Sequence, residues 1–297
     1  MELKSGIYPN VPMDEYAQWP AVNAHRLWTL RTRSPLHSQW EWEHPQEPTP
    51  SMGLGILLHT ALLEPARWAN EVVMLPEDAP RRPTQRQIDA KKPSPETVVA
   101  VKWWAEWNEK TKGKTLVDAE QKTTLDAMAE SVRRLQCHTL VTGGQAETCI
   151  VWEDPETGLM CKGRLDYQRV VGWQHCITDL KTCTNAGYDA FQRAINQYGY
   201  HHQAAFYCWG WEALTGETPS FTWLCVETDP PYAAKAWECE PSTLDAGKLS
   251  YRAALAKYAE CLAKNEWPGY GEAVEFIGLS DWALKSAGVN AFQVHME

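Results

Sequence analysis

Two neighbouring strand-like segments constrain this chain more than any other feature. They run from Met160 to Val171 and from His175 to Lys181, with a glycine in the short connection between them. Asp166 lies on the first segment, and Asp179 and Lys181 lie on the second. Because alternate residues of a strand face the same side of a sheet, Asp179 and Lys181 point together. If the segments pair through a turn at the glycine, Asp166 reaches the same place.

Two carboxylates and an ammonium at one place suit a metal-assisted attack of water on a phosphodiester. Carboxylate oxygens are the hard ligands that Mg²⁺ prefers, and a metal ion lowers the pKa of bound water. An Asp-x-Lys pair in a strand is more often a surface ion pair. The interpretation therefore depends on support from other parts of the sequence.

Composition restricts the class of protein. The chain has 297 residues, of which 44% are hydrophobic and 22% charged, as in ordinary globular proteins. No apolar run approaches the ~20 residues of a membrane span, and the N-terminus lacks the apolar core of a signal peptide. We therefore expect a cytoplasmic protein without membrane contact. The formal net charge of −10 argues against a protein that coats nucleic acid by bulk electrostatics, but permits a local basic groove.

Nine cysteines occur, and no two are closer than seven residues. This spacing argues against a disulfide scaffold, a zinc ribbon or an iron–sulfur site, and indicates buried, reduced thiols.

Positive charge gathers in residues 81–114, which we interpret as a solvated loop region, with a DNA-facing arch as the alternative. The basic residues there are Arg81, Arg82, Arg86, Lys91, Lys92, Lys102, Lys110, Lys112 and Lys114.

Helical patterns dominate the first 140 residues. Asn23 is expected to cap a helix that continues to Thr32 and ends at Ser34-Pro35, and Pro65 ends an apolar helix that begins at Gly53. Further helices are expected over Val98–Glu109 and from Asp118, where Gln121 completes a capping box. Proline-rich loops are expected at residues 44–50 and 76–97.

Strand patterns begin after Gly143-Gly144. The expected elements are a strand at Glu147–Glu153, the two strands described above, helices from Ala186 and over Tyr200–Leu214, a hairpin of Phe221–Thr228 with Ala233–Glu240, and a helix over Ser242–Lys264. This order predicts an α/β fold with a central mixed β-sheet flanked by helices. We expect a single domain over residues 1–297, with a helical part at about 1–140 and a catalytic part at about 141–297.

Two further motifs accompany the carboxylates. Gln203 and Tyr207 are spaced i, i+4 on one face of a predicted helix, where simple packing on the sheet is the alternative. His59 lies within the apolar helix Gly55–Thr60, where a core histidine is the alternative. His201 and His202 are adjacent and do not face one way on a helix, so we do not predict a metal pair there.

Together these motifs resemble the PD-(D/E)XK nuclease superfamily, which has a restriction-endonuclease-like core. They are most similar to the exodeoxyribonuclease VIII (RecE-type) phage exonucleases and to RecB-like nuclease domains. The matching motifs are Gly6-Ile7-Tyr8, Met13–Tyr16, Ser34-Pro35, Gly53–Pro65, Lys162–Asp166, Thr178–Thr182 and Gln203–Tyr207.

The resemblance implies a role for each motif. Asp166, Asp179 and the Leu180 carbonyl would hold Mg²⁺, with Mn²⁺ as an alternative, and His59 would complete or support the metal shell. Lys181 would orient or deprotonate the attacking water. The remaining candidates are Gln203 and Tyr207 for positioning DNA backbone or the lysine, and Glu147 as a weaker metal ligand or a partner of one. Apart from the resemblance, the charge of Arg26, Arg31 and Arg33 and their position near the N-terminal helix make them candidate contacts for a terminal 5′-phosphate.

The resemblance also implies a 5′→3′ exonuclease that degrades linear double-stranded DNA and leaves 3′ single strands for recombination, in a bacterial or phage-infected host cell. It implies a ring-shaped homo-oligomer, a trimer or tetramer, and a single-strand annealing protein as partner. The alternatives are a structure-specific or restriction-type endonuclease of the same superfamily, and a DNA-end-binding module without catalysis.

Overall fold

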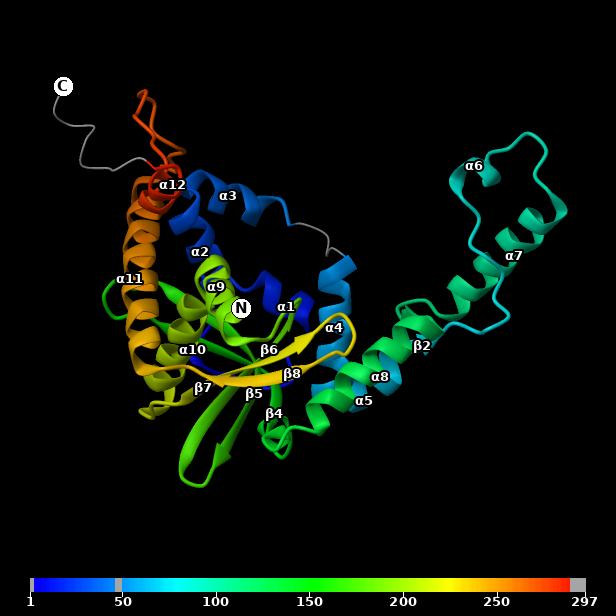
Figure 1. Cartoon of the computed structure of the whole chain (residues 1–297), viewed down its shortest axis with the longest axis horizontal. Coiled ribbons are helices and arrows are strands. Elements are labelled where there is room, and N and C mark those ends of the chain that lie inside the picture. Colours follow the sequence, from blue (N-terminus) through cyan, green and yellow to red (C-terminus); the bar gives the residue numbers. More distant parts are fainter. Residues whose placement is uncertain (1–2, 46–49, 289–297) are drawn as a thin grey trace.

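A six-stranded mixed sheet forms the centre of the molecule (Figure 1). The computed structural model describes residues 3–45 and 50–288, so most of the proline-rich loop predicted at 44–50 lies outside the described residues. In spatial order the strands are β1 (Gly6–Tyr8), β4 (Gln145–Glu153), β5 (Met160–Val171), β6 (Gln174–Cys183), β7 (Ser220–Glu227) and β8 (Ala234–Glu238). Within this sheet β6 and β7 pair in parallel, and the other neighbouring strands pair antiparallel. The predicted α/β class with a mixed sheet is confirmed.

Helices cover both faces of the sheet. One core contains Trp152, Phe206 and Trp223, and the other contains Leu58 and Leu224. Trp223 and Leu224 are successive residues of β7, so the two cores lie on opposite faces. The first core involves α2 (Ala24–Thr32), α9 (Tyr188–Tyr198), α10 (Tyr200–Thr215) and α11 (Pro241–Lys264), and the second involves α4 (Pro50–Leu63) and α8 (Ala119–Arg133).

An extension projects away from the sheet (Figure 1). Its base is a parallel pair, β2 (Val72–Met74) and β3 (Thr115–Val117), and its outer part holds α6 (Gln85–Ile88) and α7 (Pro95–Lys110). Most of residues 76–97 has no regular structure apart from α6, in agreement with the proline-rich segment predicted there.

Capping residues place several helix ends where the sequence predicts them. The Asn23 side chain accepts a hydrogen bond from the Arg26 amide, and Asp118 and Gln121 form a capping box. Another helix follows each of the two predicted helix ends. Ser34 caps α3 (Pro35–Glu43), and Pro65 begins α5 (Pro65–Glu71). A proline is well suited to the first turn of a helix, so each of these prolines ends one helix and begins another.

The N-terminal segment is fastened to the central strands. β1 pairs with β4, and α1 (Met13–Gln18) lies beside β5. Lys162 is 1% exposed, and its Nζ donates to the carbonyls of Tyr16 at 2.8 Å, Ala17 at 3.2 Å and Trp19 at 2.9 Å. One buried side chain thus joins β5 to three carbonyls at and just after the end of α1.

The turn between β5 and β6 contains Gly172 at φ +64°, a conformation that favours glycine. From there the strands pair as far as Tyr167 with Thr178, and then β6 continues beside β7 as far as Cys183. The two strands therefore separate at Asp166 and Asp179. Seven of the nine cysteines are buried and all nine are free, as predicted. In the described parts of the chain, every helix is too short or too polar to cross a membrane.

Close approach of α11 to α10 depends on Gly247, because a Cβ there would collide with the His201 carbonyl. We expect Gly247→Ala to lower the free energy of unfolding by about 1–3 kcal/mol through overpacking. Gly53 is a matched control, since it lies in α4 with no atom near its would-be Cβ. Gly53→Ala should be neutral or raise the free energy of unfolding by up to about 1 kcal/mol. Urea unfolding measures both, and equal effects would contradict this account.

Candidate active site

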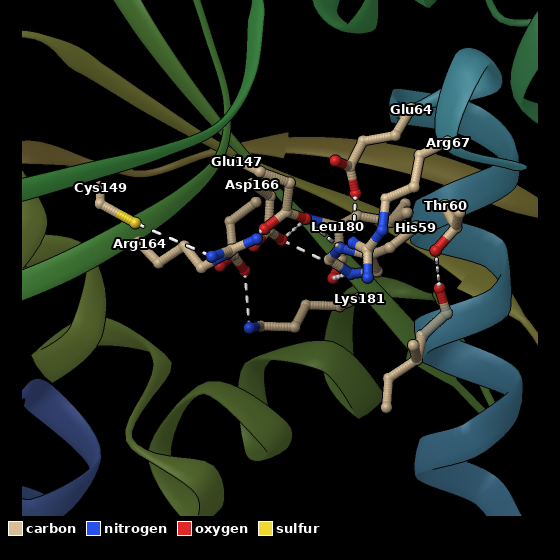
Figure 2. A network of polar contacts seen from close by, with 12 residues as sticks. His59, Thr60, Glu64, Arg67, Glu147, Cys149, Arg164, Asp166, Leu180 and Lys181 are labelled. Carbon is tan, nitrogen blue, oxygen red and sulfur yellow. Dashed lines mark hydrogen bonds and ion pairs between the residues drawn. The ribbon is translucent and has the colours of Figure 1, made fainter. Parts of the chain in front are cut away.

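Asp166 bridges the two strands where their ladder ends. Its Oδ2 accepts a hydrogen bond of 2.8 Å from the Leu180 backbone N–H. The Asp166 carboxylate thus accepts the hydrogen bond that a backbone carbonyl of β5 would accept in a continued ladder. The strands separate at this point, and the opening between them leaves room for other side chains. Figure 2 shows Asp166 and Lys181 at this opening, with His59 reaching in from α4.

Glu147 joins Asp166 from β4. The register pairs Ala146 with Tyr167 and Thr148 with Leu165, so Glu147 lies opposite Asp166 at a position where the pairing is interrupted. Its φ is +49°, which is uncommon for a residue with a side chain. Such a conformation costs about 1–3 kcal/mol and persists where the surroundings hold it.

Arg164 holds the Glu147 carboxylate in place. Its Nε forms a short ion pair with Glu147 Oε2, and its Nη1 donates to the Val11 carbonyl at 2.8 Å and contacts the Cys149 sulfur at 3.8 Å. Figure 2 shows this guanidinium between Glu147 and Cys149. Arg164 lies on β5 two residues before Asp166, so both side chains belong to the same face of the strand.

His59 lies among three oxygen atoms. Its Nδ1 is 3.6 Å from Glu147 Oε1, and its Nε2 is 3.6 Å from Asp166 Oδ2 and 3.1 Å from the Leu180 carbonyl. Burial disfavours the imidazolium, but the carboxylates of Asp166 and Glu147 outweigh it and raise the pKa of His59 to about 9. The described side chains of His59, Glu147 and Asp166 each place one ligand atom within 4.8 Å of the others.

The two carboxylates beside His59 differ in acidity. Burial raises the pKa of Asp166 to about 7, and the neighbouring charges of Asp179 and Glu147 act in the same direction. Burial also opposes charge on Glu147, yet His59 and Arg164 lower its pKa. Of these two carboxyl groups, Asp166 therefore binds a proton more readily than Glu147.

Asp179 and Lys181 form a buried ion pair, with Oδ2 and Nζ 2.7 Å apart. Asp179 is 1% exposed, and neither carboxylate oxygen has a well-directed hydrogen bond within the described chain, despite the short distance to Lys181. Burial disfavours the ammonium of Lys181, but Asp179 and Asp166 outweigh it and raise the pKa of Lys181. Lys181 is thus a cation, and Asp179 keeps unused acceptor capacity.

Helix α10 supports the lysine. Lys181 Nζ donates to Gln203 Oε1 at 3.1 Å, and Gln203 Nε2 donates to the Tyr207 hydroxyl at 3.2 Å. The Tyr200 ring lies 4.7 Å from the same Nζ. Gln203 thus contacts the lysine directly, and Tyr207 contacts Gln203.

The structure brings together eight of the ten predicted site residues: His59, Glu147, Asp166, Asp179, Leu180, Lys181, Gln203 and Tyr207. Arg26 lies elsewhere, 9% exposed, with its guanidinium over Trp42 at 4.4 Å and Tyr258 at 4.9 Å. Arg31 lies in the last turn of α2 with an exposed side chain.

Sequence reasoning gave no role to Arg164 or Tyr200. A signal for Arg164 was present, because it lies at i−2 from Asp166 within the Lys162–Asp166 motif. Tyr200 lies three residues before Gln203 and so faces the same side of α10.

The donor set of this cluster fits a divalent cation. It offers carboxylate oxygens and a backbone carbonyl, which are the ligands of hard cations. The unsatisfied buried oxygens of Asp179 and the imidazolium of His59 both indicate a demand for positive charge at this place.

Comparison with known proteins agrees with this geometry. Residues 32–279 match a family described as a PDDEXK-like domain of unknown function (DUF3799). No curated protein matches the chain.

Among solved structures, the fold resembles a candidate exonuclease from Eubacterium rectale with a TM-score of 0.55 and 12% identity, covering 93% of this chain and 98% of that one. Weaker likenesses are a phage-related exonuclease from Haemophilus somnus 129PT (TM-score 0.30, 14% identity, 63% and 92% coverage) and an alkaline exonuclease from Laribacter hongkongensis (TM-score 0.24, 18% identity, 70% and 96% coverage).

The family match spans well over half of the chain and includes the whole cluster around Asp166. The chain therefore belongs to this family of PDDEXK-like domains and is an enzyme of the PDDEXK nuclease superfamily.

Proposed function

We propose that this nuclease is a Mg²⁺-dependent exodeoxyribonuclease that degrades linear double-stranded DNA in the 5′→3′ direction. The observation that carries the proposal is the convergence of Glu147, Asp166 and Asp179 beside Lys181, at the point where β5 and β6 separate. The exonucleases among the similar solved structures agree with exonuclease activity, and the direction follows the resemblance to RecE-type enzymes.

The proposed metal ligands are Asp166, Asp179 and the Leu180 carbonyl, with His59 and Glu147 completing or supporting the shell. When bound, Mg²⁺ would activate a water molecule and neutralise charge on the phosphate. Mn²⁺ offers the same preference for oxygen ligands and is the proposed alternative.

Lys181 is proposed to orient the attacking water or the phosphate. The pKa of Lys181, raised by Asp179 and Asp166, supports an orienting ammonium over a proton acceptor. Gln203 is proposed to hold the lysine, since it accepts from Nζ, and Tyr207 to hold Gln203. Arg164 is proposed to position Glu147.

Arg26 and Arg31 are proposed contacts for the end of the DNA strand. Arg26 Nε has no hydrogen-bond partner among the described residues, and Arg26 lines a cavity of about 250 Å³ together with Trp42 and Tyr258. If they bind a terminal 5′-phosphate, 5′-phosphorylated duplex should be digested faster than 5′-hydroxyl duplex.

The proposed setting is recombination in a bacterial or phage-infected host cell. The 3′ single strands left by the reaction would pass to a single-strand annealing protein. A ring-shaped trimer or tetramer would keep an acidic protein on its acidic substrate, because a ring that encloses the DNA cannot dissociate sideways even without attraction between net charges.

Linear duplex labelled at either the 5′ or the 3′ end, incubated with Mg²⁺ beside closed circular DNA, tests the function. We expect early release of the 5′ label, retention of the 3′ label on the single strands that remain, and intact circles. Cleavage of the circles would indicate an endonuclease, and early release of the 3′ label would reverse the proposed direction.

Two substitutions test the residue roles in the same assay. Asp179→Asn weakens the proposed metal site, and Lys181→Met removes the cation proposed to orient the water or the phosphate. Each should lower the rate by about 10²–10³-fold. Lys122→Met, which changes a half-buried lysine paired with Asp126 on α8 far from the cluster in sequence, is the control and should keep full activity. Unchanged rates in the first two variants would refute the site.

Binding of Mg²⁺ should weaken as pH falls. The folded-state pKa values of His59 (about 9) and Asp166 (about 7) lie above their ordinary values, so acid adds protons that the metal must displace. Each displaced proton weakens binding about tenfold per pH unit. The Mg²⁺-induced rise in melting temperature should therefore be large at about pH 8 and small at about pH 5.5. Asp166→Asn should abolish it at both pH values.

A further inference from the structure

We propose that residues 81–114, which we call the arm, bind the phosphate backbone of double-stranded DNA outside the catalytic cluster. The proposal rests on the proposed function only in taking DNA as the ligand. The sequence alone favours a solvated loop here, but the charge balance together with three structural observations favours a binding surface.

The first observation is charge. The arm holds nine basic and four acidic residues, a net charge of +5, and the remainder of the chain holds 19 basic and 34 acidic residues, a net charge of −15. Two further acidic residues, Glu77 and Asp78, lie at the base before the arm begins. A basic segment on an acidic body attracts DNA to one place and repels it elsewhere.

The second observation is position. The arm projects beyond the body of the molecule, from the side where α4 and α8 lie (Figure 1). Its base is joined to α8, which packs on α4 through Leu58, Leu125 and Met128. Because α4 also carries His59, DNA held by the arm is held at a fixed position relative to the cluster.

The third observation is order within the arm. The Trp104 indole N–H donates to the Pro80 carbonyl at 2.9 Å, which pins the loop onto α7. The Arg82 guanidinium lies over the Trp104 ring at 4.5 Å and donates to Asn108 Oδ1 at 3.3 Å. Trp103 and Trp107 stack with ring centroids 5.2 Å apart. A surface with fixed side chains loses less entropy on binding than a mobile loop.

The fourth observation is that the basic side chains are available. All nine are exposed, and of the ion pairs found in the described chain only Lys102–Glu106, at 3.9 Å, lies within the arm. With 16 residues, α7 is about 24 Å long at ~1.5 Å per residue. That length matches about seven base pairs at ~3.4 Å each.

The salt dependence of DNA binding tests the arm. Binding of a fluorescent 40-base-pair duplex is measured by anisotropy in EDTA, so that no cleavage occurs, between about 50 and about 200 mM salt. The test variant is the full chain with Arg81→Gln, Arg86→Gln and Lys91→Gln. Each lost phosphate contact flattens the slope of log affinity against log salt by about 0.9, so we expect a decrease of about 2.7.

The control carries the same charge change on α11, with Lys248→Gln, Lys257→Gln and Lys264→Gln. It should keep the wild-type slope, because α11 lies on the other side of the sheet from the arm (Figure 1). An unchanged slope in the arm variant, or an equal decrease in the control, overturns the proposal.

Hydrolysis of bis(4-nitrophenyl) phosphate with Mg²⁺ separates this inference from the proposed function. The arm variant should hydrolyse this small phosphodiester at the wild-type rate and keep the wild-type melting temperature. A wild-type chain that binds DNA through the arm but cleaves no phosphodiester would refute the function and leave the arm intact. Loss of hydrolysis in the arm variant at an unchanged melting temperature would count against a surface separate from the cluster.

Discussion

Three carboxylates from three adjacent strands share one buried space where β5 and β6 separate. The side chains of Glu147, Asp166 and Asp179 are between 2% and 17% exposed. Like charges at such depth repel strongly, and the fold answers with one cation from each of three elements: His59, Arg164 and Lys181. The strained backbone of Glu147, the early end of the β5–β6 ladder and the entry of α4 all serve this arrangement.

The three cations are held by their partners to different degrees, and this difference matters for a nuclease. Arg164 is committed to Glu147 and to backbone and sulfur partners around it, and Lys181 is shared between Asp179 and Gln203. His59 alone makes only long contacts of 3.6 Å to its carboxylates. Its imidazolium is the cation that a metal ion displaces most easily, since the proton can leave while the ring stays as a ligand.

Local rules predicted much of this site from the sequence. Alternate residues of a strand share a face, which predicts that Asp179 and Lys181 point together. Residues i and i+4 of a helix also share a face, which predicts the same for Gln203 and Tyr207. The role of Glu147 was less visible, since glutamate has no preference for φ +49° and its ion pair with Arg164 joins two different strands. Ser34-Pro35 marked a helix boundary correctly but gave no sign that another helix follows. The pair β2 and β3 has three residues per strand, too few to show a period.

Lys162 and Arg164 also have a consequence for the order in which the chain folds. Their partners, the carbonyls at the end of α1 and that of Val11, belong to the first twenty residues, and β1 has its own partner in β4. During synthesis the N-terminal segment must therefore wait for about 150 more residues to leave the ribosome before it can dock. Loop-closure entropy over that separation makes docking a late step. Until then the chain lacks the anchored α1, and the Arg164 side chain that holds Glu147 lacks its Val11 partner.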